Sequence, residues 1–221
     1  MEKAVILLSG GLDSCVSASI AARKYKSYAL AFDYGQAHNE IEAAEKIAQK
    51  LNINLKVIKL NFLENFLKQK SERKIPELES SELDNVDVTT ETMKRVWVPA
   101  RNLVFASIAA SFAEANDCGK IFAGFNAEEG ATFPDNTQEF VDKFNEVLKF
   151  GVLKEIEIEA PLILLNKEEI VKLGDKLNAP MELSWSCYKN GEVHCGKCES
   201  CQRRKRGFES ADVPDLTEYE K

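Results

Sequence analysis

Histidine and long apolar runs are both scarce in this chain. Its 221 residues include only two histidines, His38 and His194, which leaves little room for catalysis by histidine. The longest uninterrupted apolar run is residues 4–8, far shorter than the roughly 20 residues of a membrane span. No long apolar stretch with a cleavage site follows Met1, so the sequence predicts no signal peptide, no membrane partner and a cytoplasmic location.

Positive charge is also in deficit. Lys and Arg number 29 against 36 Asp and Glu, which gives a net charge of −7. Neutralising phosphates requires clustered cations, so an acidic chain is a poor general binder of nucleic acid, and we expect no nucleic-acid partner. The one basic run, residues 203–206, is interpreted as the solvated face of a helix.

Two common phosphate-binding motifs are missing too. The chain has no G-x-x-x-x-G-K-[ST] string, which excludes a Walker-type loop. It also has no G-x-G-x-x-G string after a predicted strand, which argues against a dinucleotide site.

Short apolar runs alternate with amphipathic stretches along the chain. This alternation indicates strand–helix–strand units and a mostly parallel sheet. The expected strands are 4–8, 28–32, 55–60, 120–125 and 156–162, and the expected helices are 12–24, 41–51, 100–114, 138–149 and 166–177. Asn166 is expected to cap the last of these helices, with Glu169 as its capping-box partner.

One stretch breaks this alternation. Residues 75–91 carry six acidic residues and neither Lys nor Arg, with little apolar periodicity. An irregular insertion of this length is often a lid or a mobile loop. A solvated loop with no role is an equally good interpretation.

The most informative string is S-G-G-L-D-S at residues 9–14, between the first predicted strand and the first predicted helix. Two glycines allow a sharp turn close to a ligand, and the N-terminus of the following helix favours an anion. Ser9 and Ser14 add hydroxyl donors, whereas the carboxylate of Asp13 is expected to act through a bound cation. A plain strand-to-helix turn is the alternative, but the full string predicts nucleotide binding.

Four of the six cysteines crowd near the C-terminus with the spacing C-x7-C-x2-C-x2-C. Four thiolates at such spacing can close a tetrahedral zinc site, which leaves no open position for catalysis. The predicted ligands are Cys187, Cys195, Cys198 and Cys201. An iron–sulfur cluster is the alternative, and His194 is an alternative ligand. Cys15 and Cys118 are interpreted as buried structural thiols.

Several other strings fall where predicted elements begin or end. D-Y-G-Q at 33–36 ends the second strand, and G-F-N at 124–126 ends the fourth. V-P-A-R-N at 98–102 opens a helix, and the positive side chain of its Arg101 would point into a cleft at the edge of the sheet where these strands end. Ligands of an open parallel sheet bind beyond the carboxyl ends of the strands, so these residues are expected near the 9–14 loop.

The loop string resembles the S-G-G-x-D-S signature of the pyrophosphatase-loop ATPases. With D-Y-G-Q-A-H, V-P-A-R-N, F-P-D-N and S-C-Y…C-G-K-C-E-S-C-Q-R-R, nearly the whole chain is similar to the 7-cyano-7-deazaguanine synthase family. The resemblance implies a doubly wound, mostly parallel α/β fold of the adenine nucleotide alpha hydrolase type, with five strands in the order 3-2-1-4-5. We expect an ATP-binding domain over 1–180 and a small zinc-binding segment over 181–221.

The resemblance also implies a reaction. The family makes a nitrile from 7-carboxy-7-deazaguanine, ammonia and ATP, for queuosine or archaeosine precursors. ATP, bound with Mg²⁺, would be cleaved between its α and β phosphates and would adenylate the carboxylate and then the amide. The family carries Zn²⁺ and is typically a homodimer. The alternatives are a tRNA-thiolating pyrophosphatase-loop ligase and a zinc-knuckle binding module with a degenerate loop; the acidic charge and the intact loop string argue against them.

Carried onto this sequence, the resemblance assigns catalysis to Asp13, Ser14 and Arg101. The ATP-binding residues that it implies are Leu8, Ser9, Gly10, Gly11, Leu12, Asp13, Ser14, Cys15, Val16, Ser17 and Ala18.

The substrate loop departs from the family pattern. Residues 127–135 are A-E-E-G-A-T-F-P-D, where Glu128 or Glu129 is expected to stand in for an Asp. An aromatic ring with N–H donors calls for stacking side chains and fixed acceptors. The candidates are Phe133, Trp185 and Tyr188 for stacking, Asp135 with Glu128 or Glu129 for the ring N–H groups, and Arg101 for the carboxylate.

Overall fold

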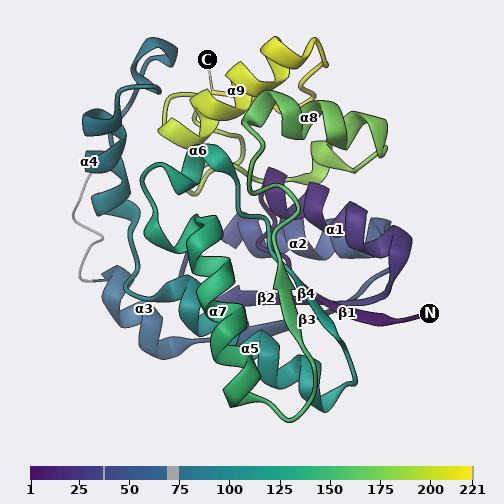
Figure 1. Cartoon of the computed structure of the whole chain (residues 1–221). Coiled ribbons are helices and arrows are strands. Elements are labelled where there is room, and N and C mark those ends of the chain that lie inside the picture. Colours follow the sequence, from purple (N-terminus) through teal and green to yellow (C-terminus); the bar gives the residue numbers. More distant parts are fainter. Residues whose placement is uncertain (37, 69–74, 221) are drawn as a thin grey trace.

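Five parallel strands form the centre of the computed structural model, which describes residues 1–36, 38–68 and 75–220 (Figure 1). Their order is β3-β2-β1-β4-β5, as the resemblance implied. The strands are β1 Lys3–Leu7, β2 Lys26–Asp33, β3 Asn54–Lys59, β4 Lys120–Phe122 and β5 Glu157–Glu159. The expected α/β fold is confirmed, although β4 and β5 are shorter than predicted. Ala37 of the D-Y-G-Q-A-H string lies outside the described residues.

Side chains of β1 alternate between the two faces of the sheet. Ala4 and Ile6 enter one buried cluster, whereas Val5 enters the other, and all three are fully buried. Ile6 pairs with Ala29 of β2 and with Phe122 of β4, so β1 lies at the centre of the sheet. A continuous apolar run suits a strand that is covered on both faces.

Helices cover both faces of the sheet (Figure 1). One layer consists of α1 Leu12–Lys24 and α2 His38–Lys50, extended past the carboxyl ends of the strands by α8 Lys167–Lys176 and α9 Glu199–Ala211. The other layer consists of α3 Asn61–Lys68, α5 Arg101–Ala115 and α7 Gln138–Gly151. The remaining helices are α4 Val86–Val96 and the one-turn α6 Ala127–Gly130, and the short 3-10 turns are Ser80–Glu82, Pro134–Asn136 and Met181–Leu183.

The predicted cap of α8 is present. The Asn166 side chain accepts a hydrogen bond from the backbone N of Glu169, and the Glu169 carboxylate accepts one from the backbone N of Asn166, both at 2.9 Å. This reciprocal pair fixes where α8 begins, and the residue that follows the cap is Lys167.

The acidic stretch 75–91 is not irregular throughout, which corrects our expectation. Its second half enters α4, which Asn85 caps by accepting hydrogen bonds from two backbone N–H groups. The buried side of α4 carries Thr89 and Thr92. Apolar periodicity does not detect this helix, because its buried positions hold threonine.

The basic run of α9 is not the solvated face that we expected either. Arg203 and Arg204 are only 7% and 1% exposed. Arg203 forms ion pairs with Glu128 and Glu199, and Arg204 forms one with Asp215. Their acidic partners allow these arginines to be buried. Glu128, the partner farthest away in the sequence, lies on α6.

Within the described ranges, no single helix is both long and apolar enough to cross a membrane. Helices α4 and α5 pass that test of length and composition only when taken together, and they are bent by 59° at the break between them. Ala106, Ala109 and Ala113 of α5 belong to the buried core.

Candidate active site and metal centre

The 9–14 loop makes a sharp turn after β1. Gly10 has a φ of +89°, and a Cβ added there would lie 2.1 Å from the backbone oxygen of Glu40 on α2. A larger residue at this position would therefore clash with backbone as well as strain the turn. Gly11 follows in an extended conformation and is the N-cap of α1.

The first backbone N–H groups of α1 follow this turn. The first backbone bond inside the helix runs from Cys15 N to Gly11 O, so the N–H groups before it have no partner within the helix. Ser9 Oγ and Ser14 Oγ lie 3.1 Å apart, and Ser14 Oγ donates to Gly11 O. Hydroxyls and helix N–H groups together suit a bound phosphate.

Asp13 is largely buried at this helix start. Its Oδ2 accepts a hydrogen bond from Lys167 Nζ at 2.5 Å, and its side chain is 14% exposed. Burial raises the pKa of Asp13 to about 6, against the lowering effect of the Lys167 charge. Its Oδ1 is buried without a hydrogen-bond partner in the described part of the chain. Such an oxygen is available as a ligand for a hard cation, so Asp13 fits magnesium.

Lys167 is a residue of this site that the sequence analysis missed. Its ammonium also lies 3.4 Å from Glu129 Oε1, and its side chain is 9% exposed. The sequence marked only its position after the cap Asn166, and nothing there distinguishes a functional lysine from a surface one. The partner that makes it notable is Asp13, 154 residues away in the chain.

The other predicted ATP-binding residues place their side chains in the core. Leu8, Leu12, Cys15, Val16 and Ala18 are at most 3% exposed. Ser17 Oγ donates to the backbone oxygen of Ala123 at 3.1 Å. A nucleotide can meet these residues only through their backbone, so their contact with ATP stays a prediction.

A second polar cluster lies where α5 begins. Arg101 Nη1 donates to Tyr34 Oη at 3.2 Å, and the Arg101 charge interacts with that of Asp135. The rings of Trp97 and Phe133 lie 6.2 Å apart. Except for Tyr34, these residues line a shallow hollow together with two valines. The hollow encloses no space for even a water molecule, so a flat ring can enter it only after its walls move apart.

Three of the residues expected to bind the substrate line this hollow: Phe133 and Asp135, expected at the ring, and Arg101, expected at the carboxylate. Trp97 was not expected. Trp185 and Tyr188 instead pack against the cysteine cluster. These two aromatic residues lie on either side of Cys187 in the sequence. Their position there could not show whether their rings face the cysteines or the substrate.

Glu128 is not free to bind a substrate ring. Its Oε1 accepts a hydrogen bond from Lys167 N at 2.8 Å, and its Oε2 accepts from Arg203 at 2.5 Å and from Arg206 at 3.2 Å. Although burial alone would raise it, these hydrogen bonds and charges hold the pKa of Glu128 below its usual range. Glu128 is therefore an ionised structural carboxylate.

The three predicted catalytic residues fall into two groups. Asp13 and Ser14 lie in the 9–14 loop, whereas Arg101 borders the hollow, and no hydrogen bond or ion pair among the described residues joins Arg101 to the other two. Glu40 connects the groups: its backbone oxygen abuts Gly10, and its carboxylate interacts with the Arg101 charge. Burial raises the pKa of Glu40 to about 7, against that charge.

The four C-terminal cysteines form a compact cluster. Their Sγ atoms all lie within 4.8 Å of one another, and the residues are at most 1% exposed. A tetrahedral zinc site with Zn–S bonds of about 2.3 Å has S–S edges of about 3.8 Å, so the cluster is close to that size. Backbone N–H groups of Lys189 and Cys195 point at Cys187 Sγ, at 3.3 and 3.4 Å. Cys187, Cys195, Cys198 and Cys201 therefore fit zinc.

His194 is engaged elsewhere. Its Nε2 accepts a hydrogen bond from the backbone N of Ser186 at 2.9 Å, and its ring lies 4.1 Å from that of Trp185. Burial lowers the pKa of His194 to about 4. Trp185 N also donates to Gly10 O at 2.9 Å, so the cysteine-bearing segment touches the 9–14 loop.

Comparison with known proteins identifies the family. The family model described as "Queuosine biosynthesis protein QueC" matches residues 3–212. The chain belongs to the QueC family. The resemblance inferred from the sequence motifs is thereby confirmed, because the matched region includes both the 9–14 loop and the four cysteines.

QueC relatives resemble this chain along its full length. The 7-cyano-7-deazaguanine synthase of Methanobrevibacter smithii is 49% identical over 222 residues, covering 99% of this chain and 98% of the relative. The protein of that name from Methanocaldococcus jannaschii is 51% identical over 230 residues, covering 98% and 99%. This QueC chain is accordingly an ATP-dependent enzyme of the ligase type.

Solved structures support the fold of this QueC protein. The structure of NMN synthetase from Francisella tularensis matches 98% of this chain and 89% of its own, with a TM-score of 0.51 and 17% identity. At that identity the likeness shows a shared fold alone.

Proposed function

We propose that this enzyme converts 7-carboxy-7-deazaguanine to 7-cyano-7-deazaguanine with ammonia and ATP. The observation that carries the proposal is the 9–14 loop. Its glycine turn, the first N–H groups of α1, which have no partner within the helix, and the Asp13–Lys167 pair form a phosphate site at the carboxyl end of β1. Relatives that cover nearly the whole chain bear the name of this activity.

The 9–14 loop binds ATP through its phosphates. The N–H groups at the start of α1 and the hydroxyls of Ser9 and Ser14 donate hydrogen bonds to phosphate oxygens. Magnesium, when bound at Asp13, supplies positive charge against the polyphosphate. The assigned catalytic roles of Asp13 and Ser14 are thus to hold and orient ATP, because positioning and charge stabilisation can accelerate adenylyl transfer without a protein nucleophile.

The hollow beside Arg101 binds the deazaguanine. Phe133 and Trp97 offer ring faces, and Asp135 offers carboxylate oxygens to ring N–H donors. Arg101 orients the substrate carboxylate, whose oxygen attacks the α phosphorus of ATP and expels pyrophosphate. Ammonia then attacks the acyl carbon, loses a proton and expels AMP, which gives the amide.

The amide becomes the nitrile in a second round at the same residues. The amide oxygen attacks the α phosphorus of a second ATP, and pyrophosphate leaves again. The nitrogen then loses its remaining protons while the carbon–oxygen bond breaks to release AMP. The 9–14 loop and Arg101 therefore act twice on the same substrate molecule. The hollow must keep the amide bound between the two adenylations.

The cysteine cluster has a structural role in this proposal. Zinc, when bound by the four cysteines, supplies a cross-link, because four protein ligands leave no open position. We also propose that residues 181–221 act as a zinc-binding segment attached to an ATP-binding domain over 1–180, and that the protein is a cytoplasmic homodimer.

A tRNA-thiolating ligase needs a reactive cysteine pair, and no observation favours one here. Burial raises the pKa of Cys15 to about 12, and burial also raises the pKa of Cys118. Thiols held protonated in this way are poor nucleophiles. The other four cysteines belong to the metal cluster.

One incubation tests the proposed function. The purified protein is mixed with 7-carboxy-7-deazaguanine, ATP, magnesium and ammonium, and the products are followed by mass spectrometry. We expect the amide and then the nitrile, with AMP and pyrophosphate formed twice per nitrile. Incorporation of nitrogen-15 from labelled ammonium must appear in the nitrile. Absence of both products in the zinc-loaded protein would contradict the proposal.

A further inference from the structure

Lys167 brings a buried positive charge directly to the 9–14 loop. Its ammonium lies 2.5 Å from Asp13 Oδ2 and 3.4 Å from Glu129 Oε1. A lysine can be buried when carboxylates supply the counter-charge, and Asp13 and Glu129 supply it here. A cation held at the phosphate end of a nucleotide site is placed to meet the negative charge of the ligand.

The Lys167 ammonium has one N–H donor more than it has acceptors among the described residues. A lysine ammonium has three N–H donors. Asp13 and Glu129 accept from Lys167, and no third acceptor is found for this ammonium in the described part of the chain. One donor therefore stays available for an oxygen of an arriving phosphate, without breaking either existing contact.

The backbone of Lys167 is held from α9. Its N–H donates to Glu128 Oε1 at 2.8 Å, and Glu128 Oε2 accepts from Arg203 at 2.5 Å. Gly207 of α9 sits so close that a Cβ there would lie 2.9 Å from the Cβ of Lys167. Helix α9 begins directly after Cys198 and carries Cys201. The helix that carries a predicted zinc ligand therefore also fixes the position of Lys167.

Charge balance explains why a lysine is needed here. Asp13 and Glu129 would together repel a polyphosphate, and Glu128 is already paired with arginine. Negative charge develops on the leaving pyrophosphate as the bond between the α and β phosphates breaks. A cation fixed beside that group stabilises the developing charge without first having to reorganise.

We propose that Lys167 binds the pyrophosphate portion of ATP through its free ammonium donor, and that Glu128 and Arg203 position it to do so. This assignment rests on the proposed function only in taking ATP as the nucleotide. It adds a substrate-contacting lysine to the loop residues. It also means that the helix carrying Cys201 supports the nucleotide site in addition to the metal.

Calorimetric titration of the zinc-loaded protein with magnesium-ATP and, separately, with AMP tests this contact. Lys167→Met should raise the Kd for ATP by about 10-fold to 100-fold, the range expected for losing a charged hydrogen bond. AMP lacks the β and γ phosphates, so its Kd should change less than about 2-fold. A loss of affinity that is equal for ATP and AMP, or no loss at all, overturns the proposal.

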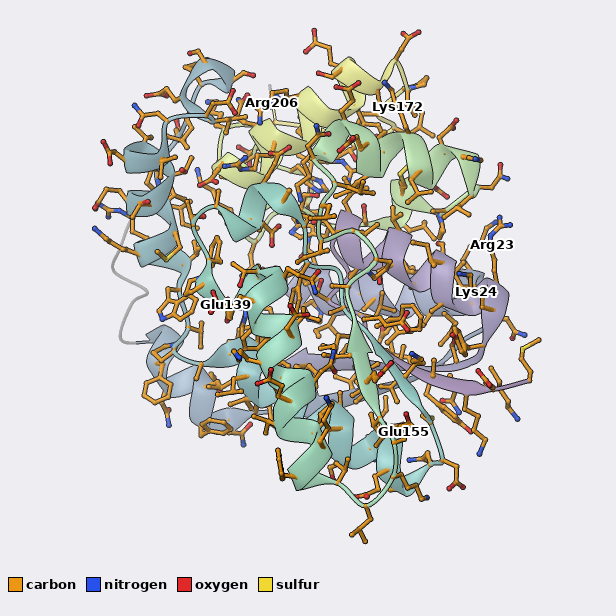
Figure 2. All side chains as sticks on the ribbon, in the orientation of Figure 1. Arg23, Lys24, Glu139, Glu155, Lys172 and Arg206 are labelled. Carbon is orange, nitrogen blue, oxygen red and sulfur yellow. The ribbon has the colours of Figure 1, made fainter. Side chains whose placement is uncertain are left out.

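Two further variants separate binding from folding. Lys167→Gln keeps a neutral donor for Asp13 but removes the charge, so its ATP-selective loss should match that of Lys167→Met even where Lys167→Met lowers the melting temperature. Lys172→Gln changes an exposed lysine on the outer side of the same helix, where Figure 2 labels it and where its partner is Glu168. This control should bind both nucleotides normally.

The positioning step has its own readout. Glu128→Gln keeps the size of the side chain but removes the charge that holds Arg203. We expect the KM for ATP to rise about 3-fold to 10-fold while the KM for 7-carboxy-7-deazaguanine stays unchanged. Glu128→Asp, which keeps the charge on a shorter side chain, should recover part of this loss. A change in both KM values, or in neither, removes Glu128 from this role.

Failure of the contact and failure of the proposed function are distinguishable. If Lys167→Met selectively weakens ATP while the unmodified protein makes no nitrile, then the inference stands and the substrate assignment fails. If the nitrile forms while the variant binds ATP normally, then the function stands and the inference fails. A protein that binds no ATP at all overturns both.

Discussion

Arg204 Nη2 donates to Asp215 Oδ1 at 3.1 Å, and this ion pair ties α9 to the C-terminal segment. Arg204 is 1% exposed, and its Nη1 also donates to Ser184 Oγ at 2.7 Å. Tyr219 Oη donates to the second oxygen of Asp215 at 2.6 Å. One buried guanidinium thus joins the segment before the cysteines to the segment after α9.

Asp215→Asn should lower the free energy of unfolding by about 2–4 kcal/mol at pH 7, because it leaves Arg204 buried without its counter-charge. Burial alone would raise the pKa of Asp215, but the Arg204 charge holds it below its ordinary value of 3.8. The stabilisation is therefore present above pH 3.8 and lost as the pH falls below it. Denaturant unfolding of both proteins at pH 7 and near pH 3 measures this difference.

The matched control for Asp215→Asn is Glu218→Gln, an exposed position in the same segment. It should change the free energy of unfolding by less than about 0.5 kcal/mol. Acid also affects the metal ligands, but it does so in both proteins, so the difference between them isolates Asp215. A difference that stays constant down to pH 3 would refute the ion-pair explanation.

Glu40→Gln should stabilise the protein at alkaline pH. The folded-state pKa of Glu40 is about 7 against an ordinary 4.5, because burial disfavours its ionised form. A raised carboxyl pKa costs stability as the pH rises from 4.5 through 7, so the gain of the variant should be absent at pH 4.5 and complete at pH 8. We expect about 1–3 kcal/mol at pH 8, with the partial exposure of Glu40 favouring the lower end. Glu45→Gln, exposed on the same helix, should show no such pH dependence.

Cys198→Ser should lower zinc content and destabilise the C-terminal segment by more than about 3 kcal/mol, because binding energy at a structural site is folding energy. Cys198 forms a β-bridge with Glu77, and Leu78 N donates to Lys197 O. Hydrogen exchange at Leu78 should therefore accelerate as well. Cys118→Ser replaces an equally buried thiol outside the cluster and should leave both readouts unchanged. Iron with acid-labile sulfide in place of zinc would replace the zinc assignment.

Asp135→Ala should weaken binding of 7-carboxy-7-deazaguanine by at least about 10-fold and binding of ATP by less than about 3-fold. Asp135 is 8% exposed and lines the hollow, so a ring N–H donor that loses it stays unpaired. Arg101→Ala should chiefly slow the first adenylation, and Phe133→Leu should act more mildly than either. Calorimetry with the deazaguanine decides the matter: unchanged affinity in Asp135→Ala removes the hollow from the substrate site.

Asp13→Ala should reduce pyrophosphate release by about 100-fold or more, because it removes the one loop carboxylate that fits a magnesium ion. Circular dichroism should still show the folded protein, because Glu129 remains as a carboxylate partner of the buried Lys167, although the melting temperature should fall. Asp175→Ala, an exposed change on α8, is the control. Near-normal pyrophosphate release from the Asp13 variant would be incompatible with the proposed role of the loop.

Local patterns in the sequence determined much of this protein. Apolar periodicity predicted all five strands and the order of the main helices, because burial on a sheet or a helix repeats at short, fixed spacing. The 9–14 loop was predictable since glycines and a helix start lie within six residues. The four ligand cysteines were predictable because the metal requires close spacing. These features need no partner from elsewhere in the chain.

Only the tertiary structure decided which charges are buried and what they do. Lys167 meets Asp13 across 154 residues, Arg203 meets Glu128 across 75, and neither pair leaves a trace in local spacing. For the same reason, the sequence did not show that Trp97 lines the hollow or that Trp185, which we expected at the substrate, packs against the cysteines. A charged or aromatic side chain is compatible with surface, core or site, and the choice depends on partners that come into range only when α6, α8 and α9 pack above the sheet.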